Sequence, residues 1–131
     1  MGKDNMKVFV YGSLKKGHWN NKLFLHSSDF ICKAKTLDSN YDMVSLGGFP
    51  AMENGGDYYI SGEVYKVNKE TLRHLDILEG NGYFYTREKI RVIPIDEQVP
   101  DCFYAWAYMM ASNHRSVSSP MPFDDFNTKN W

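Results

Sequence analysis

The chain has 131 residues, of which 24% are charged and 43% are hydrophobic, and its formal net charge is -1. This length suits one folded domain with its own core, and the composition excludes an intrinsically disordered chain. The small net charge provides no general attraction to nucleic acid or to an anionic membrane surface, so we expect neither as a partner.

Targeting and metal-binding signals are missing from the sequence. No positively charged start followed by an apolar stretch marks a signal peptide, and no apolar run approaches the ~20 residues that span a bilayer. Cys32 and Cys102 lie far apart and belong to no pair with zinc-ligand spacing. We therefore expect a cytoplasmic protein without a zinc site or a disulfide framework.

The first half of the chain predicts strands joined by turns. Lys7–Tyr11 is a predicted buried strand, because KVFVY is short, β-branched and aromatic and is followed by a glycine. NNKLFLHSS predicts a short helix, FICKAKT and YDMVSL predict strands, and GGFP and ENGGD are turn signals. Tyr58–Val67 is a further predicted strand, in which Gly62 indicates a bulge or the close approach of another backbone.

The second half contains the clearest predicted helix, NKETLRHLDILEG. Asn68 suits its N-cap, Glu70 suits its first turn, and Gly80 is a natural C-terminal stop. YFYTREKIRVIPI and CFYAWAYMM follow as long strands, and residues 111–131 are expected to form an irregular tail. Several strands with one good helix predict an α+β domain with a mixed or barrel-like sheet. We expect a single domain over residues 1–131, with its core at about 7–110.

The loop YGSLKKG, which follows the first strand, has the glycine spacing of a phosphate-binding P-loop. That motif needs Lys and then Ser or Thr after its second glycine, but His18 and Trp19 follow Gly17 here. The lysine for the phosphates and the hydroxyl for Mg²⁺ are therefore missing, which argues against a nucleotide. Consecutive backbone N–H groups in a tight turn can still form a concave site for a carboxylate or an oxyanion. The alternative is a turn without a ligand.

The end of the predicted helix carries an unusual carboxylate. Leu72, Leu75 and Glu79 are spaced i, i+3 and i+7, which places Glu79 on the apolar face of the helix. Burial and the negative end of the helix dipole both predict a raised pKa for Glu79, which suits general acid–base catalysis. The alternative is that the helix frays before Glu79 and the carboxylate reaches solvent. Asp76, on the same side, is expected to make a structural hydrogen bond.

A hydrolase with a serine or cysteine nucleophile finds no support in the sequence. Ser13 lies in the loop, and the histidines that could serve as a base are His18, His26, His74 and His114. However, GSL lacks the G-x-S-x-G pattern of a nucleophile elbow, and neither cysteine lies in a known catalytic signature.

Four stretches together resemble the γ-glutamylcyclotransferase-like superfamily, and most closely its branch of γ-glutamylamine cyclotransferase and plant AIG2-like proteins. They are VFVYGSLKKG, YDMVSLGGFPAM, GEVYKVNKETLRHLDILEG and YFYTREKIRV. The resemblance implies a small mixed-strand β-barrel with few helices. It also implies that Tyr11, Gly12, Ser13 and Leu14 bind the glutamyl part of a small-molecule γ-glutamyl substrate through backbone amides, with Glu79 as the general acid/base.

The chemistry that this resemblance implies belongs to the acyltransferase or lyase class and needs no cofactor. The substrate's own α-amine attacks its γ-carbonyl and yields 5-oxoproline and a free amine or amino acid. The alternative is a non-catalytic module that binds a carboxylate ligand on the same barrel. Tyr85 and Tyr108 are candidates for walls of the pocket. The resemblance carries no prediction of the oligomeric state.

Overall fold

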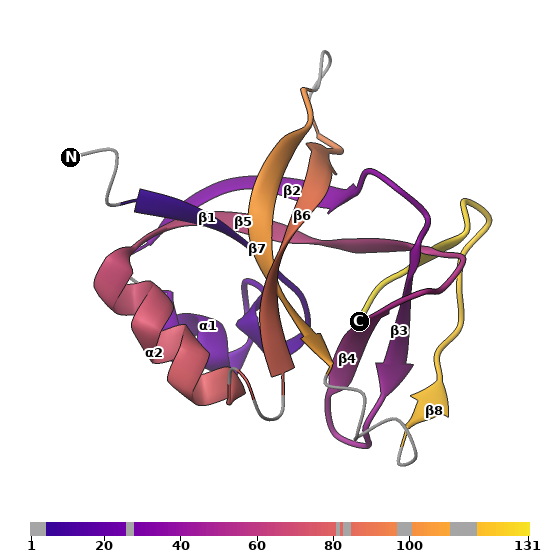
Figure 1. The fold of residues 1–131 in the computed structure, drawn as a ribbon, viewed down its shortest axis with the longest axis horizontal. Coiled ribbons are helices and arrows are strands. Elements are labelled where there is room, and N and C mark those ends of the chain that lie inside the picture. Colours follow the sequence, from indigo (N-terminus) through magenta and orange to yellow (C-terminus); the bar gives the residue numbers. More distant parts are fainter. Residues whose placement is uncertain (1–4, 26–27, 81, 83–84, 97–100, 111–117) are drawn as a thin grey trace.

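The computed structural model describes residues 5–25, 28–80, 82, 85–96, 101–110 and 118–131 (Figure 1). In chain order, the elements within these ranges are β1 (Asn5–Val10), the 3-10 turn η2 (Gly12–Leu14), α1 (Trp19–Phe24), β2 (Asp29–Thr36), β3 (Tyr41–Ser45), β4 (Pro50–Asn54), β5 (Tyr59–Asn68), α2 (Lys69–Glu79), β6 (Tyr85–Pro94), β7 (Phe103–Met110), β8 (Ser119–Pro120) and β9 (Thr128–Lys129). No helix in this part of the chain is long and apolar enough to cross a membrane.

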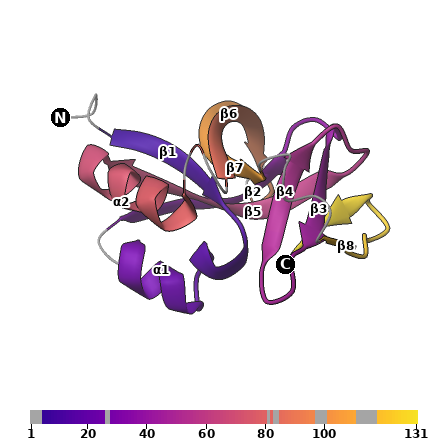
Figure 2. The same cartoon turned by 60° about the horizontal axis from the view of Figure 1, so that its bottom comes forward.

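Five strands form a closed ring. Antiparallel pairings connect β1 to β5, β5 to β2, β2 to β6 and β6 to β7, and a parallel bridge between Val8 and Trp106 joins β7 back to β1. The strands β4, β3 and β8 continue the sheet from β7. The two α-helices lie on one side of the ring, and β3, β4 and β8 lie on the other (Figure 2). The predicted α+β fold, with a closed mixed sheet and few helices, is confirmed.

The first strand is buried on both faces, as its sequence predicted. Val8 and Val10 pack with the helices, whereas Phe9 packs inside the ring, because successive side chains of a strand point to opposite faces. All three side chains are at most 2% exposed. The chain that leaves this strand at Tyr11 therefore starts from a fixed position in the core.

The helix α2 begins and ends where the sequence predicted. The Asn68 side chain caps the start by accepting a hydrogen bond of 2.7 Å from the backbone N–H of Thr71. At the other end, Gly80 adopts a left-handed conformation, with φ 60°, and its N–H bonds the carbonyls of Asp76 and Ile77. The helix is therefore intact through Glu79, and the predicted alternative of fraying before this residue is wrong.

Gly62 is the point of close backbone approach that the sequence predicted. A Cβ on Gly62 would lie 2.4 Å from the carbonyl oxygen of Val10 and 2.8 Å from the Phe9 ring. The bulge in this part of the sheet lies elsewhere, at the register shift between Phe30 and Cys32. A residue with a side chain therefore cannot occupy position 62 without moving the end of β1.

The tail adds two strands of two residues each in its described part, 118–131. β9 runs parallel to the start of β5, with Thr128 opposite Tyr59. The rings of Tyr58 and Phe123 are 5.0 Å apart between centroids. This part of the tail therefore packs against the body of the domain.

Candidate active site

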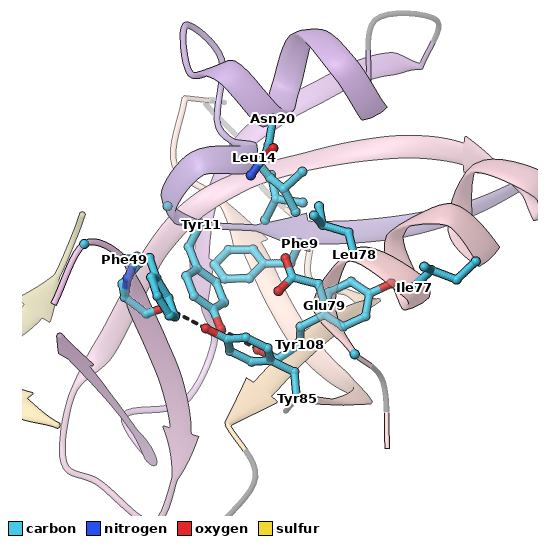
Figure 3. Close-up of a pocket in the computed structure, with 15 residues that line it drawn as sticks. Phe9, Tyr11, Leu14, Asn20, Phe49, Ile77, Leu78, Glu79, Tyr85 and Tyr108 are labelled. Atoms are coloured by element: carbon cyan, nitrogen blue, oxygen red, sulfur yellow. Dashed lines mark hydrogen bonds between the residues drawn. The ribbon is translucent and has the colours of Figure 1, made fainter. Parts of the chain in front are cut away.

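A cavity of about 490 Å³ opens between the start of the YGSLKKG loop and the end of α2 (Figure 3). Among the predicted site residues, Tyr11, Gly12, Leu14 and Glu79 line it. The side chain of Ser13 lies outside the described part of the structure. Two segments that are far apart in the sequence, and that were singled out for separate reasons, therefore meet at one cavity.

The loop forms a single 3-10 turn at the cavity wall. The N–H of Lys15 closes this turn on the carbonyl of Gly12 at 3.1 Å. The N–H groups at the start of such a turn have no partner inside it, and the Tyr11 side chain does not cap it. The turn thus presents backbone donors of the kind that bind anions.

Gly12 is required by both conformation and space. Its φ is 66°, in the left-handed region that side chains other than glycine rarely adopt. A Cβ at this position would lie 2.9 Å from Cγ of Pro50. The turn can therefore approach the GGFP segment this closely only with a glycine at its first position.

The Tyr11 side chain points away from the turn and connects two strands below the cavity. Its hydroxyl donates to the carbonyl of Tyr108 in β7 and accepts a hydrogen bond of 3.1 Å from the N–H of Met52 in β4. Burial raises the pKa of Tyr11 well above its ordinary value, so the phenol stays neutral. Tyr11 therefore fixes the position at which the turn begins.

Polar contacts from β5 and α1 hold the rest of the loop. Glu63 accepts a hydrogen bond of 2.8 Å from the N–H of Lys16 and one of 3.2 Å from the Tyr65 hydroxyl. The Asn21 side-chain amide donates to the carbonyl of Leu14 at 2.8 Å and to Tyr65 at 2.9 Å. No local pattern in the sequence marks these residues, because their roles depend on which strands and helices lie beside the loop.

Glu79 extends from the last turn of α2 into the cavity. Figure 3 shows its carboxylate pointing toward the side on which Phe9 and Tyr11 lie. Burial raises the pKa of Glu79 from 4.5 to about 7, because the surrounding side chains remove most of its water. Near neutral pH this carboxyl group can therefore both accept and donate a proton.

Asp76 makes structural interactions, as the sequence predicted. Its carboxylate forms a bidentate ion pair with Arg87, with distances of 2.8 and 3.2 Å, and accepts a hydrogen bond of 2.8 Å from the Tyr108 hydroxyl. The Arg87 guanidinium lies 4.4 Å from the centroid of the Trp106 ring. Asp76 thus attaches α2 to β6 and β7.

Replacing Asp76 with Asn is expected to affect stability more than turnover. Because Asn cannot form the ion pair with Arg87, we expect the free energy of unfolding to fall by about 1–2 kcal/mol, while kcat stays within about threefold of the wild type. Urea unfolding and steady-state kinetics measure the two effects. Arg73→Gln, at an exposed position of the same helix, is the control. A large loss of kcat without a loss of stability would contradict a structural role.

Apolar and aromatic side chains form the other walls. Tyr85 and Tyr108 line the cavity, as predicted, and the Tyr85 hydroxyl donates to the carbonyl of Pro50 at 3.0 Å. Burial, and in second place the charge of Glu79, raise the pKa of Tyr85. Phe49, Ile77 and Leu78 line the mouth of the cavity and are large exposed hydrophobic residues that sequence analysis did not identify.

The histidines give no support to a hydrolase. Within the described part of the chain, His18 and His74 are absent from the cavity lining, and His74 is exposed on α2. His26 and His114 lie outside the described residues.

Comparisons with known proteins identify the family to which the chain belongs. The sequence matches the family model described as "Gamma-glutamyl cyclotransferase, AIG2-like" over residues 8–128. Two relatives share the name "Putative gamma-glutamylcyclotransferase". The protein from Methanocaldococcus jannaschii is 43% identical over 86 residues, covering 66% of this chain and 71% of the relative. The protein from Vibrio cholerae is 34% identical over 108 residues, covering 82% and 84%.

A solved structure gives the same result for the fold. The crystal structure of a mouse AIG2-like protein superimposes with a TM-score of 0.74 at 29% sequence identity, covering 82% of this chain and 78% of the mouse chain. Sequence and fold therefore agree over most of the chain, and the protein belongs to the AIG2-like γ-glutamylcyclotransferase family.

Proposed function

We propose that the protein is a γ-glutamylcyclotransferase that converts a γ-glutamyl amine or a γ-glutamyl amino acid into 5-oxoproline and the free amine. The observation that carries this proposal is that the Glu79 carboxyl group, with its raised pKa, lines the same cavity as the turn at Tyr11–Leu14. Membership of the family supports this type of activity in general.

The turn would bind the charged end of the substrate. A γ-glutamyl group carries an α-carboxylate, and backbone N–H groups in a tight turn suit such an anion without any cationic side chain. With the carboxylate held at the turn, the α-amine and the γ-carbonyl extend into the cavity toward Glu79. The turn thereby limits the shapes that the flexible substrate can adopt.

The reaction rearranges bonds within one molecule. The α-amine nitrogen attacks the γ-carbonyl carbon, a five-membered ring closes, and the bond between that carbon and the leaving nitrogen breaks. The attacking ammonium loses two protons as it becomes the ring amide. Glu79 takes one of them and returns it to the leaving nitrogen as the bond to the γ-carbon breaks, and the other ends on the released amine as its ammonium form, so that no water is consumed. Holding the amine near the carbonyl provides much of the acceleration, and the proton transfers typically add ~10²–10⁴-fold.

The pH dependence of kcat/KM is expected to report the pKa of Glu79. Because the base must be ionised to accept the proton, kcat/KM should fall about tenfold per unit of pH below the Glu79 pKa of about 7. Initial rates in overlapping buffers at a saturating and a low substrate concentration measure this limb. Constant kcat/KM down to about pH 5.5 would contradict the proposed base.

The proposed reaction is tested with a panel of γ-glutamyl amines and γ-glutamyl amino acids. We expect 5-oxoproline and the free amine to appear in equal amounts for at least one substrate class. The α-glutamyl isomers have the same mass and charge but no γ-amide, and N-acetylated substrates lack the nucleophile, so both should be inert. Tight binding without 5-oxoproline across the whole panel would instead favour the carboxylate-binding module.

A further inference from the structure

The end of the chain lies beside the candidate anion-binding turn. In Figures 1 and 2, the segment drawn in yellow packs beside β3 and β4, and the C-terminus lies next to β4. β9 pairs with β5, and the N–H of Tyr59 donates to the carbonyl of Asn127 at 3.0 Å. Residues that follow β9 therefore reach the side of the domain on which β4 meets the turn.

Lys129 fixes this segment to the body of the domain. Its side chain is only 4% exposed, and its ammonium group lies 2.6 Å from the Asp42 carboxylate and 4.3 Å from the centroid of the Tyr58 ring. A buried ammonium group is costly unless it is paired, so breaking the ion pair between Lys129 and Asp42 is strongly unfavourable. The two residues after Lys129 are thereby held in place.

These two residues contact the turn directly. The Lys15 ammonium group donates to the side-chain oxygen of Asn130 at 2.9 Å and to the carbonyl of Trp131 at 2.7 Å. The Trp131 ring lies 4.0 Å from the position of a Cβ on Gly12, and Pro50 is also within contact distance of that position. Gly12 is therefore enclosed by Pro50 and Trp131, and Lys15 connects the end of the turn to the end of the chain.

We propose that Lys15, Asn130 and Trp131 are positioning residues, which hold the turn at Gly12–Leu14 in the conformation that binds the substrate. A single 3-10 turn with one internal hydrogen bond cannot by itself offset the entropy of ordering its residues, at ~1–2 kcal/mol each. The contacts with the fixed segment supply part of this ordering. Asn130 and Trp131 lie beyond the residues that match the family model, 8–128.

The kinetic test rests on the proposed cyclotransferase activity. Lys15→Met keeps the apolar stem but loses the donors, and we expect KM to rise about tenfold, with kcat within about twofold. The reason for this split is that the turn binds the carboxylate equally in the ground state and in the transition state. Lys15→Arg keeps a donor and should restore KM. Lys22→Met removes the same charge from an exposed site on α1 and should leave KM unchanged.

A second variant distinguishes positioning from direct attraction of the substrate by the Lys15 charge. Asn130→Ala combined with Trp131→Ala leaves the lysine in place, and we expect it to raise KM as well. When these changes are added to Lys15→Met, the effects should be less than additive, because all three residues act through one contact. An unchanged KM in either variant of an active enzyme overturns the proposal, as does an equal rise in Lys22→Met.

Hydrogen exchange tests the contact without any substrate. The Lys15 N–H bonds the carbonyl of Gly12, and the His18 N–H bonds the carbonyl of Lys15, both at 3.1 Å. In Lys15→Met, NMR should show these two amides exchanging at least about fivefold faster than in the wild type, with no such change in Lys22→Met. If the wild type forms no 5-oxoproline, the proposed function fails and this measurement alone decides the inference. Wild-type exchange rates in Lys15→Met would then overturn it.

Discussion

Glu79→Gln is expected to lower kcat by about 10²–10⁴-fold while the substrate still binds. Gln keeps the shape of Glu and most of its hydrogen bonding, but it cannot accept the proton of the attacking ammonium. The backbone donors of the turn are unchanged by the substitution, so the dissociation constant for the substrate should stay within about threefold. Single-turnover kinetics together with calorimetric binding separate the two quantities.

The same substitution is expected to stabilise the fold above pH 7. In the folded state the pKa of Glu79 is raised from 4.5 to about 7, so folding favours the protonated carboxyl group and loses stability as pH rises between these values. Because Gln stays neutral, Glu79→Gln should be more stable by up to about 3 kcal/mol above pH 7, and most of this gain should be absent at about pH 5. Urea unfolding at pH 5 and pH 8 measures it.

Glu70→Gln is the matched control for both measurements. Glu70 is an exposed residue in the first turn of the same helix, where its negative charge interacts favourably with the positive end of the helix dipole. We expect normal turnover and no gain in stability from this variant. Near-normal turnover in Glu79→Gln would refute the catalytic role, and equal stability of Glu79→Gln and the wild type at pH 8 would refute the raised pKa.

Gly62→Ala is expected to destabilise the protein by about 3 kcal/mol, although it adds only one methyl group. That methyl group would lie 2.4 Å from the carbonyl oxygen of Val10 and 2.8 Å from the Phe9 ring, so the end of β1 has to move. Val10 directly precedes Tyr11, and we therefore also expect a higher KM. Urea unfolding and steady-state kinetics measure the two effects.

The control for the stability effect is Gly48→Ala. A Cβ on Gly48 would meet no atom within 4 Å, and Gly48 does not adopt a left-handed conformation. It should unfold at the same urea concentration as the wild type. If Gly62→Ala also unfolded at the wild-type urea concentration, the close approach of β1 and β5 at Gly62 would not contribute to stability.

Local patterns were sufficient to predict α2 and the unusual placement of Glu79. The N-cap at Asn68, the left-handed Gly80 and the apolar spacing of Leu72 and Leu75 all act within one helix, so they are visible in a single stretch of sequence. The evidence against a P-loop was also confined to one stretch of sequence, because it rested on the residues that follow Gly17. A barrel-like sheet was predicted both from the pattern of elements and from the resemblance to the family, but the pairings that close the ring were not, because strand patterns do not specify partners.

Contacts between distant residues could not be predicted from these patterns. The hydrogen bond from the Lys16 N–H to Glu63 depends on the register of β5, because a slip of one residue would turn the Glu63 side chain to the opposite face. The hydrogen bonds from Lys15 to the end of the chain depend on where the tail packs after β9. Phe49 and Ile77 were missed for a different reason. Large apolar residues indicate a core position in most sequences, whereas these two are exposed at the mouth of the cavity.

The parallel bridge between Val8 and Trp106 has a consequence for the order of assembly during folding. It joins the first strand to one formed near the other end of the chain, and the turn after β1 meets Pro50, Glu63 and Trp131 only through the same long-range packing. Loop closure between segments so far apart in the sequence is slow, and short segments of the chain cannot form these contacts by themselves. We therefore expect the candidate site to form with the last closing steps, and a ligand that binds at the turn to stabilise the whole ring against opening.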